Sequence, residues 1–239
     1  MLKYILLSFM TLSLVIPNGT LKGTVYYKGS VPKPKSLSMD AAPVCGKQHA
    51  KPVRSEKFTA RKVKDSEEEK LYTLKDVMIW ITGAKGELPT EPAILNQVGC
   101  VYEPHVLPVM KGQTVLIQNN DPTLHNVHSM PEVNTSFNFA MPKVIKEKET
   151  VFNKVEEPFY IKCDVHPWMK SWVVVTDNPY FASTDKYGNY SIEGIPAGEY
   201  EVVFWQEKFG MKRAQTMTVT ISEEGMTTQD VRFEQPKKK

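Results

Sequence analysis

The feature that most constrains the fold is a pattern of short runs in which apolar and polar residues alternate and which end at turn residues. Val77, Ile79 and Ile81 fall on one face of such a run, and the pattern returns in QTVLIQN, SWVVVTD, GEYEVVFW and QTMTVTIS. Alternation with a period of two is typical of half-buried strands. No segment has the long apolar stripe of a packed helix, and the charged segment 65–75 is expected to be a solvated loop or hairpin edge. The sequence therefore predicts an all-β protein.

Length and charge narrow the class of protein further. The chain has 239 residues, which is enough for one large domain or two small ones. Its formal net charge is +3, and Lys and Arg are scattered rather than gathered into a stripe, so nucleic acid is not expected as a partner. The sequence has no nucleophile elbow, phosphate-binding glycine loop or HExxH motif, so we do not expect an enzyme.

The N-terminal segment has the pattern of a secretory signal. One early Lys precedes an apolar run from Tyr4 to Ile16, which Pro17 ends. A bilayer span needs about 20 apolar residues, so this run is too short to cross and fits a signal peptide better. We expect residues 1–19 to be removed and the mature chain to be periplasmic or secreted, without a transmembrane span. An uncleaved amphiphilic anchor is the alternative.

The chain has three cysteines, Cys45, Cys100 and Cys163. An odd number in an exported protein requires an explanation for one of them, because the compartment is oxidising. If a metal holds Cys163, the other two cysteines can form a disulfide. Unpaired buried thiols at positions 45 and 100 are the alternative.

The segment CDVHPWM places a thiolate, an imidazole and a thioether within seven residues, at Cys163, His166 and Met169. A blue-copper site uses these three donors together with one more imidazole, which has to come from another strand. His125, in the segment DPTLHNVHS, lies 38 residues before Cys163 and is the candidate. Taken alone, a CxxH pair is more typical of a structural or zinc site, and a methionine is more often a core residue.

Two segments together, YEPHVLPVMKGQTVLIQNNDPTLHNVHS and EPFYIKCDVHPWMKSWVVV, resemble the cupredoxin family of plastocyanin and amicyanin. The resemblance covers about residues 91–177, and the CxxHxxM spacing and the HNVH motif are particularly similar to amicyanin. It implies a Greek-key β-sandwich at 90–177 that holds one type 1 copper ion. The residues that match the copper ligands of the family are His125, Cys163, His166 and Met169.

The same resemblance assigns roles to the neighbours of the ligands. Asn126 matches a residue whose hydrogen bonds tie the two ligand segments together and tune the thiolate. His166 is expected near the molecular surface. Pro167 and Trp168 match an apolar patch around the exposed edge of that histidine, where a redox partner protein would dock.

A second resemblance concerns the two ends of the chain. The segments TDKYGNYSI and IPAGEYEV, with turns at Gly188 and Gly198, resemble the carboxypeptidase regulatory-like, or transthyretin-like, β-sandwich. First strands of the type found in that family, LKGTVYYKG and DVMIWITG, lie far upstream. We therefore expect a split sandwich, with first strands and a long loop at 20–89, the remainder at 178–236 and the cupredoxin domain inserted between them. Two modules in tandem are the alternative.

Three further histidines need separate interpretations. His128 lies three residues after His125, so in a strand the two side chains face opposite sides, and we expect a packing or surface role. His49 and His105 each lie close to a cysteine. A second metal site built from these two histidines with Cys45 and Cys100 is conceivable, but a disulfide with incidental histidines is simpler.

The sequence as a whole predicts an exported type 1 copper protein that carries single electrons between redox partners. A copper carrier or storage protein and a surface interaction module with a structural metal site are the alternatives. The pattern names no particular redox partner.

Overall fold

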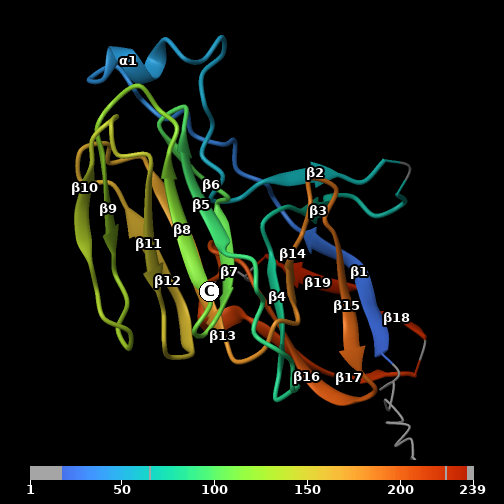
Figure 1. The fold of residues 1–239 in the computed structure, drawn as a ribbon. Helices are drawn as coiled ribbons and strands as arrows, with labels where there is room; N and C mark the ends of the chain where they lie inside the picture. Colours follow the sequence, from blue (N-terminus) through green and yellow to red (C-terminus); the bar gives the residue numbers. More distant parts are fainter. Residues whose placement is uncertain (1–17, 65, 224, 236–239) are drawn as a thin grey trace, which may run out of the picture.

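The computed structural model describes residues 18–64, 66–223 and 225–235, and Figure 1 shows that strands dominate this part of the chain. Two short helical turns accompany the strands: α1 (Pro43–Gly46) and η1 (Met211–Arg213). The prediction of an all-β protein is confirmed. No helix among the described residues is long and apolar enough to cross a membrane.

Most of the predicted signal peptide, residues 1–17, lies outside the described residues. The first described strand, β1 (Asn18–Lys28), includes Asn18 and Gly19, which the prediction assigned to the signal peptide. Both residues pair with the end of β15, opposite Pro196 and Ile195.

The two ends of the chain combine into one pair of sheets. The first sheet contains β1, β2 (Ala60–Lys62), β3 (Leu71–Leu74), β15 (Asn189–Pro196), β18 (Met226–Thr228) and β19 (Val231–Glu234). The second contains β4 (Met78–Thr82), β14 (Phe181–Ser183), β16 (Gly198–Trp205) and β17 (Gln215–Ile221). One core cluster includes apolar residues from both sheets, among them Leu21, Ile79 and Phe204. Strands from before residue 83 and after residue 180 thus complete each other.

The middle of the chain forms two further sheets. The first contains β7 (Val106–Met110), β9 (His125–Ser129), β10 (Asn138–Met141), β12 (Glu156–Lys162) and β13 (Lys170–Thr176). The second contains β5 (Ala93–Val98), β6 (Val101–Glu103), β8 (Thr114–Asn119) and β11 (Glu147–Val151). In the described part of the chain, these strands pair only with one another, as an inserted domain requires. The domain limits at residues 89/90 and 177/178 stay a prediction.

A long arm, residues 29–59, leaves the end of β1 and returns to β2. It includes α1, which Figure 1 shows above the end of the middle sheets, on the side away from β16 and β17. Met39 and Cys45 from the arm are buried in the core of the middle sheets. Cys45 forms a disulfide with Cys100, so the arm is covalently joined to the turn between β5 and β6. This is the pairing that the sequence favoured.

The segment 65–75 differs in part from the expected solvated loop. Its second half forms β3, which pairs with both β1 and β2. Leu71 and Leu74 are buried, whereas Tyr72 and Thr73 are only partly buried. The sequence around this strand is rich in charged residues, so Leu71 and Leu74 did not by themselves indicate a strand.

Candidate metal centre

The four predicted donors come from one strand and from the loop that follows its neighbouring strand. His125 is the first residue of β9, Cys163 follows the last residue of β12, and His166 and Met169 lie between β12 and β13. β9 and β12 pair antiparallel, with Lys162 opposite His128. Because alternate side chains of β9 face the core, His125 and Val127 point inward and are fully buried.

The donor atoms converge on one point. The Nδ1 atoms of His125 and His166 are 2.9 Å apart, and Nδ1 of His166 is 3.8 Å from Sγ of Cys163. The ligand atoms of these three residues all lie within 4.8 Å of one another, and all three residues are buried. Zinc, for comparison, takes imidazole nitrogen at about 2.0 Å and thiolate at about 2.3 Å, so ligands of one such ion lie within roughly 4.6 Å of each other. The distances of 2.9 and 3.8 Å lie within this limit, so these donors are close enough to share one ion.

Met169 closes the loop that carries the sulfur and nitrogen donors. Its backbone N–H donates to the carbonyl of His166 at 2.9 Å, and its carbonyl accepts from the N–H of Cys163 at 3.3 Å. Its side chain is fully buried in the same core cluster as Cys163. The loop is thus a short hydrogen-bonded turn in which His166 and Met169 are buried, while Asp164, Val165 and Pro167 are exposed.

The environment of Cys163 favours the thiolate. Burial alone would raise the pKa of the thiol, but hydrogen bonding with His125 and backbone N–H groups outweighs burial and lowers the pKa. The N–H groups of Asn126 and His166 donate to Sγ at 3.5 and 3.4 Å. A thiolate is the form in which cysteine binds a metal.

Asn126 ties β9 to the ligand loop, as its sequence position suggested. Its Oδ1 accepts from the backbone N–H of Asp164 at 2.6 Å, and its Nδ2 donates to side-chain oxygens of Asp164 and Asn138 at 3.1 and 2.9 Å. The hydroxyl of Tyr102 donates to the carbonyl of Asn126 at 2.6 Å. The residue between the two donor segments is therefore held from three directions.

Asp121 belongs to the site and was missed by the sequence reasoning. Its Oδ2 lies 2.8 Å from Nε2 of His125, and both side chains are fully buried. The same carboxylate accepts the backbone N–H groups of Gly99 and Cys100 at 2.7 and 2.8 Å. Burial opposes these charges, but the contact with His125 and the two N–H groups lower the pKa of Asp121, and the carboxylate raises the pKa of His125. An aspartate four residues before the histidine, in NDPTLH, was the only signal in the sequence.

The expected surface position of His166 is wrong. The residue is 4% exposed, and its Nε2 faces Sγ of Cys45 at 3.6 Å. The ring of Trp168 lies 5.1 Å from the imidazole, and its Nε1 donates to the carbonyl of Cys100 at 2.9 Å. The arm and its disulfide cover the edge that the family resemblance exposes. Pro167 stays exposed and Trp168 is half-buried.

The remaining histidines lie outside this cluster. His128 faces outward and contacts Asp164 at 2.9 Å, in line with a surface role. Nε2 of His49 lies 2.7 Å from the carbonyl of Gly99, and Nε2 of His105 lies 2.8 Å from Glu207. Cys45 and Cys100 are bonded to each other, so a second metal site from these cysteines with His49 and His105 is not formed in this structure.

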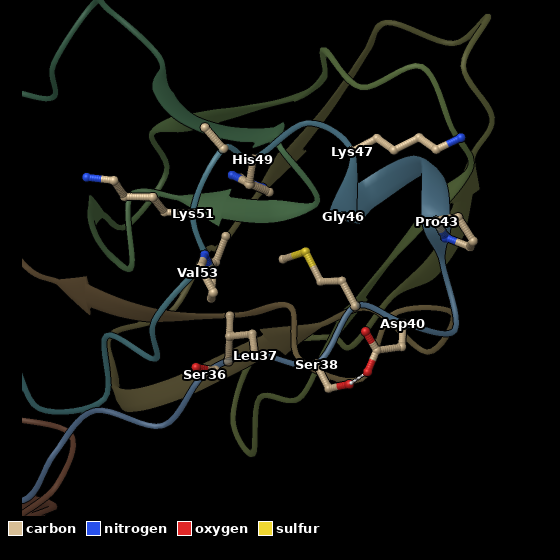
Figure 2. Close-up of a pocket in the computed structure, with 13 residues that line it drawn as sticks. Ser36, Leu37, Ser38, Asp40, Pro43, Gly46, Lys47, His49, Lys51 and Val53 are labelled. Carbon is tan, nitrogen blue, oxygen red and sulfur yellow. Dashed lines mark hydrogen bonds between the residues drawn. The ribbon is translucent and has the colours of Figure 1, made fainter.

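Two open cavities lie near the site. The larger, of about 700 Å³, is formed by the arm alone, and Figure 2 shows Leu37, His49 and Val53 around it. None of the four predicted donors lines it. The second, of about 590 Å³, is lined by Tyr102, Trp168 and Met169 together with charged residues of the arm. Only this second cavity, of the two, reaches the ligand loop.

Comparisons with known proteins give partial likenesses. No family model and no curated protein matches the chain. A purple cupredoxin from Nitrosopumilus maritimus is 25% identical over 35% of this chain and 99% of its own, with a TM-score of 0.30. A mutant of amicyanin in its Cu(I) form is 23% identical over 41% of this chain and 97% of its own, with a TM-score of 0.32.

A copper-containing nitrite reductase from Thermus scotoductus is 27% identical over 39% of this chain, with a TM-score of 0.31. This chain covers only 24% of that enzyme. At such TM-scores the likenesses carry no argument about the site, and its chemistry rests on the donor geometry described above.

Proposed function

We propose that the protein is an exported type 1 copper protein that carries single electrons. The observation that supports this most directly is the convergence of His125, Cys163 and His166, three buried donors brought together by two paired strands and one loop. Met169, on the same loop, would supply a weakly bound thioether. Two imidazoles, one thiolate and a thioether are the donor set of blue-copper sites.

The residues around the donors suit electron transfer better than metal release. Asn126 and Asp121 hold the two donor segments from outside, and the disulfide covers His166. Copper bound here would supply a one-electron change of oxidation state. The chain contributes donors that are held in place by hydrogen bonds on each side, so little of the protein has to rearrange when the charge of the site changes.

We further propose that this protein is a carrier rather than an enzyme, and that its redox partner is another protein. The predicted signal segment and the Cys45–Cys100 disulfide support a periplasmic or secreted location. For the sheets formed by the two chain ends we propose a carboxypeptidase regulatory-like sandwich that positions the copper unit. That role rests on resemblance alone.

Titration of the metal-free protein with Cu(II) tests the proposal. We expect an intense visible charge-transfer band that saturates at one equivalent, together with a reversible one-electron couple in voltammetry. Cys163→Ser, which preserves the size of the side chain, should lose the band. His128→Gln, outside the cluster, should keep it. Binding without a band would contradict the type 1 assignment, and rapid copper loss to a chelator would instead indicate a copper carrier or storage protein.

A further inference from the structure

The second cavity, called the basic cleft below, has walls from three separate parts of the chain. Arg54 and Lys57 belong to the arm, Tyr102 to β6, and Trp168 and Lys170 to the ligand loop and the first residue of β13. Its volume is about 590 Å³. The three walls meet beside the donor cluster, so an occupant of the cleft would lie against the loop that carries Cys163, His166 and Met169.

A partner can approach the site through the cleft, whereas the edge of His166 is covered. Nε2 of His166 is covered by Cys45, and Nε2 of His125 by Asp121. Trp168 lines the cleft and its ring lies 5.1 Å from that of His166. One aromatic ring therefore lies between the cleft and the proposed ligand His166.

The charges that line the cleft are unbalanced. Its two carboxylates are already paired, Glu56 with Lys75 and Glu207 with His105. Within residues 18–64, 66–223 and 225–235, no ion pair involves Arg54, Lys57 or Lys170. Burial and the neighbouring charge of Lys57 lower the pKa of Lys170, while Glu207 opposes them. The unpaired charge of the cleft is positive.

The arrangement of these groups favours a protein over a small anion. The partly exposed side chains of Leu37, Val53 and Trp168 form an apolar part of the lining, whereas Arg54 and Lys57 are exposed. The ammonium group of Lys170 is held over the rings of Tyr160 and Trp172, at 4.1 and 4.4 Å. An apolar centre with a charged rim is the usual anatomy of a protein–protein interface.

We propose that the basic cleft is the docking surface for an acidic face of an electron-transfer protein, whose carboxylates contact Arg54, Lys57 and Lys170. This inference rests on the proposed function. In the transfer step, the reduced partner loses one electron and the metal centre gains it, with Trp168 between them. No atom or proton is exchanged.

The rate of electron exchange with charged reagents tests the charge of the docking surface. Hexacyanoferrate(III), an anion, and tris(phenanthroline)cobalt(III), a cation, would each oxidise the reduced copper protein by one electron. In Arg54→Glu with Lys57→Glu, we expect the rate with the anion to fall about tenfold at low ionic strength and the rate with the cation to rise. Added salt should shrink both effects.

Lys22→Glu with Lys186→Glu is the matched control, because it changes the net charge equally at two exposed positions, one in β1 and one in the turn between β14 and β15. It should alter both rates far less. Equal effects of the two double variants would overturn the proposal, since only the overall charge would then matter. A protein without a charge-transfer band or a reversible couple would contradict the proposed function instead, and the rate test would not apply.

A binding measurement on the metal-free protein remains informative in that case. Calorimetry with poly-L-glutamate, a polymer of protein carboxylates, should show binding that Arg54→Glu with Lys57→Glu abolishes and Lys22→Glu with Lys186→Glu preserves. Poly-L-lysine should not bind. If the rate with hexacyanoferrate(III) falls in Arg54→Glu with Lys57→Glu while poly-L-glutamate does not bind the parent protein, the cleft accepts small anions only. In that case the proposal of a protein partner is wrong.

Discussion

At the scale of single residues, the contact between Asp121 and His125 orients an imidazole that we propose as a copper ligand. The carboxylate fixes the ring so that Nε2 faces Asp121 and Nδ1 faces His166. Asp121→Asn keeps the shape of the side chain but removes the charge. We expect Cu(II) affinity to fall about 10–100-fold, as is typical when the outer partner of a ligand histidine is lost.

The charge of Asp121 should also affect the relative stability of bound Cu(II) and Cu(I). An anion beside the site stabilises Cu(II) more than Cu(I), so its removal should raise the reduction potential. For each factor of ten by which the Cu(II) affinity falls more than the Cu(I) affinity, the reduction potential rises by about 59 mV. Chelator competition and voltammetry measure both quantities. Asp164→Asn is the control, because Asp164 is exposed and contacts His128 and Asn126 rather than a ligand ring. A similar shift in both variants would contradict a specific role for Asp121.

The residues that the sequence could indicate were those with unusual chemistry at fixed spacing. Cys163, His166 and His125 were found because a thiolate and imidazoles near one another limit the possible sites. Asp121 was missed because an isolated aspartate in a turn-rich segment is usually solvated, and only the fold buries it. The exposure of His166 was predicted wrongly for a related reason, since the covering residue, Cys45, lies 121 residues upstream.

At the scale of elements, the arm is the part that distinguishes this site from a bare sandwich end. The disulfide closes a loop of 55 residues between Cys45 and Cys100. In the chain-entropy view, opening a loop of this length lowers the free energy of unfolding by about 4 kcal/mol. We expect Cys45→Ser with Cys100→Ser to show a loss of this order in denaturant unfolding.

Release of the arm should also uncover His166. In the metal-free double variant, we expect diethyl pyrocarbonate to modify His166 faster than in the parent protein, with the sites mapped by mass spectrometry. His128, already partly exposed in the parent, should react at an unchanged rate. If His166 stays protected and stability barely changes, then packing of residues such as Met39, rather than the disulfide, holds the arm in place.

Individual strands were predictable where short apolar runs lie close to turn residues, as in β4 and β16. The charged surroundings of β3 hid a strand that pairs on both sides. The parallel pairs β5–β8 and β7–β13 could not be read from local pattern, because register between distant segments depends on the cores that they share.

At the scale of the whole molecule, contacts join the middle sheets to those formed by the chain ends. Trp172 from β13 packs on Trp205 from β16, with ring centroids 5.1 Å apart. Beside them, Nε2 of His105 lies 2.8 Å from Glu207, and both side chains are at most 10% exposed. The sequence indicated two units but not these contacts, because no motif marks any of the four residues as part of an interface. We expect the buried pair to make the association of the two units depend on pH.

The direction of that dependence follows from the two pKa shifts. Burial would lower the pKa of His105, but Glu207 outweighs it and raises the pKa above 6.5. Burial would raise the pKa of Glu207, but His105 outweighs it and lowers the pKa below 4.5. The contribution of His105 is complete below pH 6.5 and is lost as the pH rises through its raised pKa. That of Glu207 is complete above pH 4.5 and is lost as the pH falls through its lowered pKa.

The pair should therefore stabilise the fold most between about pH 4.5 and 6.5. A double-mutant cycle with His105→Gln and Glu207→Gln, followed by denaturant unfolding, should give a coupling of about 1–3 kcal/mol at pH 5.5. The coupling should shrink towards pH 9, where the imidazole is neutral and the contact is an ordinary hydrogen bond. His128→Gln with Asp164→Asn, the exposed pair, should show weaker coupling at pH 5.5 because solvent screens it. A coupling between His105 and Glu207 that does not change with pH would mean that the contact joins the two units without a charged imidazole.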